Sequence, residues 1–383
     1  QKAIDLDGYF GFPQPLAALI PAYQAGHLLV AHACGSADAS RSHFDCMRHF
    51  EEGAVTSSAL FSGWLARHLA NSPPTAPNAL VRAVGIDYGL QRCLAGAPLT
   101  LSIPDLANFN LTGNPNSVAA RRAVLSDMYQ NFGGTLANAA STTQVTIDLL
   151  SQIDFVNYVP GGGAVYPSNN TFCIGLRSAA ALIKADVGVE AIALDLAGWD
   201  THVQQGVFGG NMFNLMTNLA QGLAAFHADI NAGNGRNVTV VAMSEFGRRL
   251  QENGGVGTDH GHGSVMFVMG NNIAGGQVLT QWPGLAPEQL FQGIDLAVTT
   301  DWRDVLAEII YHRLGNPNLD VVFPGYTPSF RGVTTACATP DFNCDGVKSL
   351  DAVEPFVNAV MDPEGSRFSH PDCNVTRADL NIA

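Results

Sequence analysis

The sequence has few charged residues and very few lysines. Only 14% of its 383 residues are charged, and just three of the 19 cationic residues are lysines. With 33 acidic residues, the formal net charge is −14. A nucleic-acid-binding protein needs a basic face that releases counterions from phosphates. We therefore expect no nucleic-acid partner.

Long apolar runs are also missing. No window contains the roughly 18 uninterrupted apolar residues of a membrane span, so we expect no span. Apolar residues still make up 46% of the chain, which is enough for a large buried core and too many for a disordered protein. At about 100–200 residues per domain, the length allows two or three domains, or one large domain with an appendage.

Residues 1–330 alternate short β-rich runs with amphipathic helical stretches. Four apolar runs with little alternation are typical of strands buried on both faces of a mostly parallel sheet: His27–Ala33, Glu190–Ala197, Asn237–Met243 and Ser264–Met269. Apolar residues at helical spacing predict a crossover helix between the second and third strands, at Asn211–Ile230. Further helices are expected at Ser42–Glu52, Ser57–Ala70, Ser117–Asn131, Leu136–Ile153, Thr171–Ala185 and Trp302–Leu314. We predict an α/β domain with three layers, α/β/α, around a mostly parallel sheet.

Polar segments adjoin all four predicted strands. Residues 35–44, 198–202 and 244–248 follow strands, whereas 257–263 precede one and need their loop to return to the same edge. Ligands of such sheets gather beyond the carboxyl ends of the strands. Four polar segments at one edge are the main functional signal in the sequence.

Two of these segments contain carboxylates and imidazoles at close spacing. Asp259, His260 and His262 lie in a segment with glycines at 257, 261 and 263, and glycines let ligands converge closely. Asp200 and His202 lie two apart after a buried strand, so an extended backbone would turn both to one side. Such ligands suit zinc, manganese or iron. The alternatives are a polar glycine turn for the first group, and a helix cap with a surface histidine for the second.

Glu245 is a further candidate ligand, because it follows the third predicted strand directly. Arg248 lies three residues later, and an ordinary local ion pair between the two is the alternative interpretation.

Ser40 and Ser42 lie at the expected start of a helix. A helix N-terminus presents N–H groups and a positive dipole that suit an anionic ester. A serine there, close to a divalent ion, can act as a nucleophile. Arg41 and Arg248 are candidates for holding the non-bridging oxygens of the ester. The alternative is helix capping, since Ser42 and Asp45 have the spacing of a capping box.

The C-terminal part of the chain changes character. Residues 331–340 are typical of a linker, and 341–383 have regularly spaced acidic residues. Asp341, Asn343 and Asp345 match the first positions of a calcium loop. The twelfth position is Ala352 instead of an acid, so an acidic turn without an ion is the alternative.

Several segments together resemble the bacterial family known as domain of unknown function 1501, a sulfatase-like branch of the alkaline phosphatase superfamily. They are Ala39–Asp45, Ala197–His202, Met243–Arg248, Gly257–Gly263, Asp301–Glu308 and Val322–Gly325. The resemblance implies an alkaline phosphatase-like domain over 1–330, two divalent ions, a serine or threonine nucleophile at a helix start, and secretion to the periplasm or cell surface. The tail at 341–383 resembles dockerin-like repeats of secreted planctomycete proteins.

By motif position, Asp200 and His202 resemble one ligand pair, and either His260 or His262 resembles the last ligand histidine. Ser42 is the first choice of nucleophile and Ser40 the second. Glu245 stands where the superfamily usually has an Asp-His pair. Members also usually begin with a strand that ends in an Asp ligand, and this segment would lie before Gln1. These two departures predict one ion, or none, in place of two.

Two functions follow from this pattern. The first is a secreted, metal-dependent hydrolase of phosphate or sulfate esters that uses a serine nucleophile. The second is a non-catalytic surface or assembly protein on a hydrolase-derived fold, with a protein partner or self-assembly through the calcium-binding tail.

Overall fold

The body of the protein contains a five-stranded main sheet and a three-stranded second sheet. In the computed structural model, the described residues are 2–55, 60–111, 113–132, 134–206, 208–233 and 235–335. The predicted calcium loop, with Asp341, Asn343 and Asp345, lies outside them. The main sheet has the order β10-β3-β8-β7, with β9 also paired to β3, and a second sheet has the order β5-β4-β6.

The strands are short apart from two. The main sheet consists of β3 (Leu28–Gly35), β7 (Val240–Ala242), β8 (Ser264–Met269), β9 (Gln277–Leu279) and β10 (Thr300–Asp301). The second sheet consists of β4 (Ala83–Gly85), β5 (Thr100–Ser102) and β6 (Ala191–Ala193). An N-terminal hairpin is formed by β1 (Ile4–Asp5) and β2 (Gly11–Phe12).

The prediction of a mostly parallel main sheet needs a correction, because the sheet is mixed. β8 runs antiparallel to both β3 and β7, whereas β9 and β10 run parallel to β3. The second sheet is parallel throughout. In the antiparallel pair, Ser264 at the start of β8 lies opposite Cys34 near the end of β3. Residues 257–263 therefore reach the edge where β3 ends without a crossover connection.

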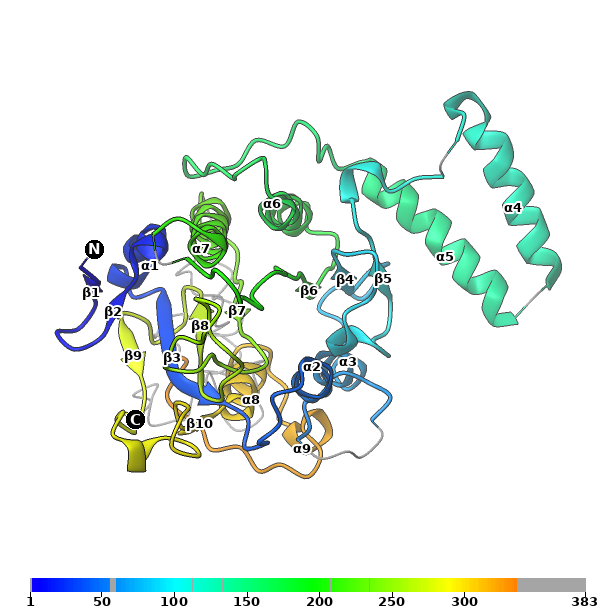
Figure 1. Ribbon diagram of the computed structural model, residues 1–383. Helices are drawn as coiled ribbons and strands as arrows, with labels where there is room; N and C mark the ends of the chain where they lie inside the picture. Colours follow the sequence, from blue (N-terminus) through cyan, green and yellow to red (C-terminus); the bar gives the residue numbers. More distant parts are fainter. Residues whose placement is uncertain are drawn as a thin grey trace, which may run out of the picture.

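Helices pack on both faces of the main sheet (Figure 1). Leu28 and Val30 of β3 pack with α6 (Thr171–Lys184) and α7 (Asn211–Ile230). The alternate residues Leu29 and Ala31 pack with α2 (His43–Glu52) and α8 (Trp302–His312). Burial of both faces explains why the β3 sequence is apolar without alternation.

The other helices are smaller or lie outside this core. They are α1 (Ile20–Gln24), α3 (Trp64–Ala70), α4 (Val118–Phe132), α5 (Gly134–Ser151) and α9 (Leu319–Val322), with short 3-10 turns at Gln14–Leu19, Arg92–Leu94, Leu106–Asn108, Pro115–Ser117 and Pro287–Gln289. α4 and α5 form a hairpin that projects from the body (Figure 1), and we call it the arm. In the described ranges, none of the helices combines the length and apolar character needed to cross a bilayer.

Most predicted elements are present with changed bounds. The strand predicted at Ser264–Met269 matches β8, but those predicted at Glu190–Ala197 and Asn237–Met243 shrink to β6 and β7. Among the described residues, β6 pairs with β4 and β7 pairs with β8, and no ladder joins β6 to β7. The backbone on either side of these short ladders is thus outside regular strand pairing, and most side chains of β6 and β7 are only partly buried.

Candidate metal centre

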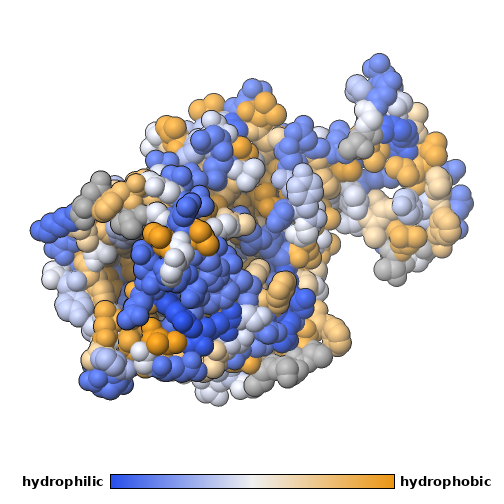
Figure 2. Space-filling model, in the orientation of Figure 1, coloured by the Kyte–Doolittle hydropathy of each residue, from blue (hydrophilic) through white to orange (hydrophobic). Residues whose placement is uncertain are grey.

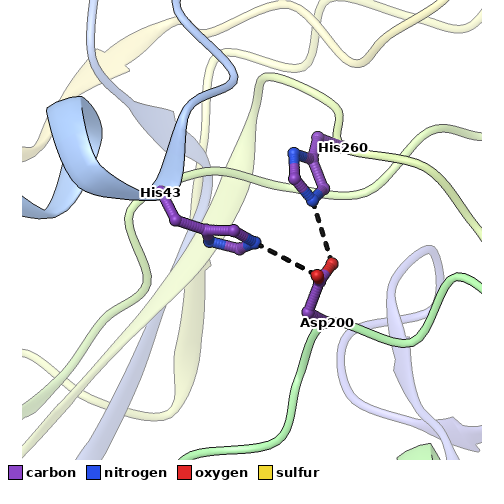
Figure 3. A group of neighbouring side chains, drawn as sticks. All are labelled: His43, Asp200 and His260. Carbon is purple, nitrogen blue, oxygen red and sulfur yellow. Dashed lines mark hydrogen bonds and ion pairs between the residues drawn. The ribbon is translucent and has the colours of Figure 1, made fainter.

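Histidines and a carboxylate from three separate segments meet beyond the end of β3. His43 is the first residue of α2, Asp200 lies in the segment that follows β6, and His260 lies in the segment that leads into β8. Figure 3 shows both imidazoles directed at the Asp200 carboxylate. One donor atom of each residue lies within 4.8 Å of the other two, a spacing that allows all three to coordinate one ion.

Glycines bring the two loops beneath this group into contact. Arg248 and His260 form an isolated antiparallel bridge, and the Gly261 N–H donates to the Gly247 carbonyl over 2.7 Å. A Cβ atom at Gly247 would collide with the carbonyl oxygen of Gly263. Glycine is therefore required there for the loops to approach closely enough to place His260.

Three histidines are held by the same kind of contact at Nδ1. Each Nδ1 lies within hydrogen-bond distance of an oxygen that only accepts, which favours the tautomer with the proton at Nδ1. The pairs are His43 with Glu245 Oε1 at 2.6 Å, His202 with Asp259 Oδ1 at 3.0 Å, and His260 with the Arg41 carbonyl at 2.7 Å. Outer partners of this type fix the tautomer and orientation of metal-binding histidines.

The opposite nitrogens of these rings converge on Asp200. Nε2 of His202 and Nε2 of His260 each lie 2.9 Å from Oδ1 of Asp200, and they lie 3.0 Å from each other. Nε2 of His43 lies 3.5 Å from Oδ2 of Asp200 and is buried without a hydrogen-bond partner. In a neutral ring protonated at Nδ1, Nε2 carries a lone pair. A divalent cation between these nitrogens and the carboxylate would be bound by all of them, and the donor set of imidazole nitrogens and a carboxylate oxygen fits zinc, manganese or iron.

Neighbouring groups keep the carboxylates of this group ionised. Partial burial raises the pKa of Asp200, but the hydrogen bond from the Arg248 guanidinium and the contacts with the His260 and His202 imidazoles outweigh it and hold the pKa below its usual range. Hydrogen bonds from Asn253 and His202 likewise lower the pKa of Asp259. Asp200 is therefore available as a charged ligand at neutral pH.

The two arginines predicted to hold an ester already contact carboxylates. Nη1 of Arg248 donates to Oδ1 of Asp200 over 2.8 Å. Nε of Arg41 donates to Oδ2 of Asp295 over 2.9 Å, and Asp295 is fully buried. The Arg41 guanidinium is thus engaged with Asp295, whereas that of Arg248 remains within the centre.

The two predicted nucleophiles have structural roles at the start of α2. Ser42 is the N-cap, and its Oγ accepts a hydrogen bond from the Asp45 N–H over 3.4 Å. The Ser42 N–H in turn donates to Oγ of Ser40 over 3.2 Å. The capping role considered from the sequence is thus present, and it places Ser42 next to His43. Catalysis by either serine remains a prediction.

One predicted ligand does not join the group, and one residue that the sequence did not single out does. The ring of His262 stacks on Phe291 with centroids 3.9 Å apart, whereas the imidazoles in contact with Asp200 are those of His43, His202 and His260. His43 was part of the predicted serine segment, but its imidazole was not predicted as a ligand. The signal that could have found it is its place at the first turn of a helix that follows a buried strand.

Comparisons with known proteins place the chain in a family without adding a function. The model of the family described as "Protein of unknown function (DUF1501)" matches residues 28–314. No curated protein and no solved structure gives a significant match. The matched range includes all the histidines and carboxylates of the centre.

Proposed function

Because the chain belongs to the DUF1501 family, whose function is unknown, we propose that it is a secreted, metal-dependent hydrolase of phosphate or sulfate esters on an alkaline phosphatase-like fold. The observation that carries the proposal is the convergence of three Nε2 atoms on Asp200, each ring fixed at Nδ1 by an oxygen acceptor. A transition metal at this point would polarise the ester and lower the pKa of a nearby hydroxyl or water.

The residues around that point divide the work. His43, Asp200 and His260 hold the ion, with His202 as a fourth candidate ligand. Glu245 and Asp259 orient the imidazoles of His43 and His202, a role that differs from the ligand role predicted from the sequence.

Ser42 lies one residue from His43 at the N-terminus of α2. The N–H groups and dipole of this helix stabilise negative charge on a bound ester oxygen. Attack by the Ser42 oxygen on the phosphorus or sulfur would form a covalent ester with Ser42 while the bond to the alcohol breaks and the alcohol leaves with a proton; water would then hydrolyse this ester, releasing phosphate or sulfate and restoring the Ser42 hydroxyl. Arg248, at the same carboxylate as the ligands, balances charge beside the ester.

A second candidate function has one observation in its favour. Both arginines predicted to clamp the ester are engaged by carboxylates, Arg41 by Asp295 and Arg248 by Asp200. A non-catalytic surface or assembly protein that keeps the metal for structure would need no such clamp. The calcium-binding tail proposed from the sequence would then serve attachment to a partner.

Metal content is the decisive measurement. We expect about one equivalent of zinc, manganese or iron per chain in protein purified without chelator, measured by inductively coupled plasma mass spectrometry. His260→Ala should lose it and His262→Ala, the matched control two residues away, should keep it. Protein without a transition metal, or with metal unchanged in His260→Ala, would refute the centre. A loaded protein inactive on a panel of phosphate and sulfate esters would favour the second function.

A further inference from the structure

The outer helix of the arm has no buried face. None of the 15 residues of α4 is buried. Isolated helices of this length are marginal in water, because most helical stability in proteins comes from packing an apolar face. α4 therefore lacks part of the packing that a helix of its length normally has.

The side of α4 turned to solvent is apolar in part. Val124, Met128 and Phe132 recur every four residues and so lie on one side of the helix. They are 58%, 54% and 73% exposed, and Leu136 beyond the hairpin turn is 53% exposed. We call these four residues the arm stripe. Apolar surface on the arm is visible in Figure 2, in contrast to the polar surface over the middle of the body.

The second helix of the arm packs against the body. Ile147 and Leu150 near the end of α5 are buried, and Leu150 packs in a core cluster with residues of the second sheet. α4 is linked to α5 by the ion pair of Arg122 with Asp148, 2.5 Å apart. The arm therefore holds the stripe away from the body, where another molecule can reach it.

Charge indicates what covers the stripe. Residues 113–151 contain two arginines and two aspartates, so their net charge is zero, whereas the whole chain carries −14. Two copies of this acidic chain repel each other over most of their surface, and the neutral arm is a place where they can meet. An anionic lipid surface attracts clusters of lysine and arginine, and the arm has no cationic excess.

We propose that the arms of two copies pack stripe against stripe about a two-fold axis, as an antiparallel four-helix bundle. A two-fold contact uses the same patch on both partners, so the patch must be complementary to itself. An apolar stripe without net charge meets this requirement. Two helical hairpins that share an apolar core are an established way to build such a bundle. Met128, at the middle of the stripe, lies nearest its counterpart in the second copy.

Sedimentation velocity on the full chain over a range of micromolar concentrations tests the proposal. The wild-type protein should sediment as a dimer, and Met128→Glu should weaken the dimer at least about tenfold, because it buries an unpaired charge. Val159→Glu is the matched control, since Val159 is an 82% exposed apolar residue outside the arm. It should leave the dimer intact. A wild-type monomer at every concentration, or a dimer unchanged by Met128→Glu, overturns the proposal.

A cross-link gives a second measurement that does not depend on disrupting the arm. Met128→Cys should form a disulfide between copies on oxidation, because residues near a two-fold axis come within the short Cα distance that a disulfide needs. Val159→Cys should not. A Met128→Cys protein that stays monomeric, with α4 protected from hydrogen exchange, would show that another part of the chain covers the stripe and would refute the second copy.

Discussion

The metal centre and the arm both leave side chains partly in solvent, but they hold them in different ways. In the centre, each of three imidazoles has an oxygen acceptor at Nδ1 that fixes the direction of Nε2. In the arm, the stripe residues are more than half exposed and α4 buries no residue. The contrast separates a site whose donor atoms are oriented in advance from a surface that gains order only with a partner.

This difference distinguishes an exposed side chain that belongs to a binding site from one that belongs to a surface for association. Asp200 remains nearly half exposed although its neighbours are arranged around it. Its exposure therefore leaves room for an ion or a substrate. The exposure of Phe132 leaves apolar area in water, and such area marks a surface for association.

The largest expected effect comes from the root of the arm. Leu150→Ala should lower the free energy of unfolding by about 2–5 kcal/mol, because it empties a packed site in the core. Val124→Ala on the exposed side of α4 should change the stability of the monomer by less than about 0.5 kcal/mol, since alanine also has the higher helix propensity. Urea unfolding at low protein concentration measures both.

Equal losses in the two variants would break the comparison, because they would mean that α4 is packed as firmly as the end of α5. Circular dichroism before unfolding checks that both proteins start from the same helix content.

The sequence predicts the helices of the arm better than it predicts their position relative to the body. Helices at Ser117–Asn131 and Leu136–Ile153 were predicted close to α4 and α5, because spacing within a segment reports on local structure. Their projection from the body was not predicted, since periodicity does not say what a face packs against. The antiparallel direction of β8 was also not predicted, because an apolar run does not show whether a strand runs parallel or antiparallel to its neighbours.

The centre was predicted in its composition more than in its geometry. Asp200, His202 and His260 come from glycine-rich motifs that are local in the sequence, and the structure brings them together. The pairing of His43 with Glu245 joins residues 202 positions apart, so only the tertiary fold reveals it. His260 and His262 were equivalent in the sequence, and the stacking of His262 on Phe291 separates them.

A buried histidine outside the metal centre makes the stability of the protein depend on pH. His68 in α3 is 3% exposed, and its Nδ1 lies 3.1 Å from the amide nitrogen of Asn316, a donor. Burial lowers the pKa of His68 to about 4. As pH falls, the unfolded chain takes up this proton near 6.5 and the folded chain only near 4. The stability present above 6.5 is therefore lost progressively down to about 4.

The size of this loss follows from the two pKa values. At about 1.4 kcal/mol per unit, the shift from 6.5 to about 4 corresponds to about 3 kcal/mol. Urea unfolding at a series of pH values should show the loss in the wild-type protein and a smaller one in His68→Gln, which cannot titrate. Identical pH profiles for the two proteins would mean that His68 takes up its proton equally well in both states.

A smaller effect than that of His68 is expected from the orientation of His43. Glu245→Ala removes the acceptor at Nδ1 of His43 and should weaken metal binding by about 10–100-fold, as the loss of an outer partner does. Glu245→Gln keeps a carbonyl acceptor and should fall in between. Glu288→Ala changes an exposed glutamate of the turn Pro287–Gln289 and should have no effect. Competition with a metal-sensitive dye measures all three.

The comparison with His260→Ala decides what Glu245 does. If Glu245 is itself a ligand, as its position after the third predicted strand suggested, its removal should cost as much affinity as the loss of His260. If it only fixes the His43 ring, the cost stays smaller and Glu245→Gln recovers part of it. The 2.6 Å contact between Glu245 Oε1 and His43 Nδ1 favours the second outcome. It engages the Glu245 carboxylate with Nδ1, on the side of the imidazole opposite Nε2, and leaves Nε2 for the ion.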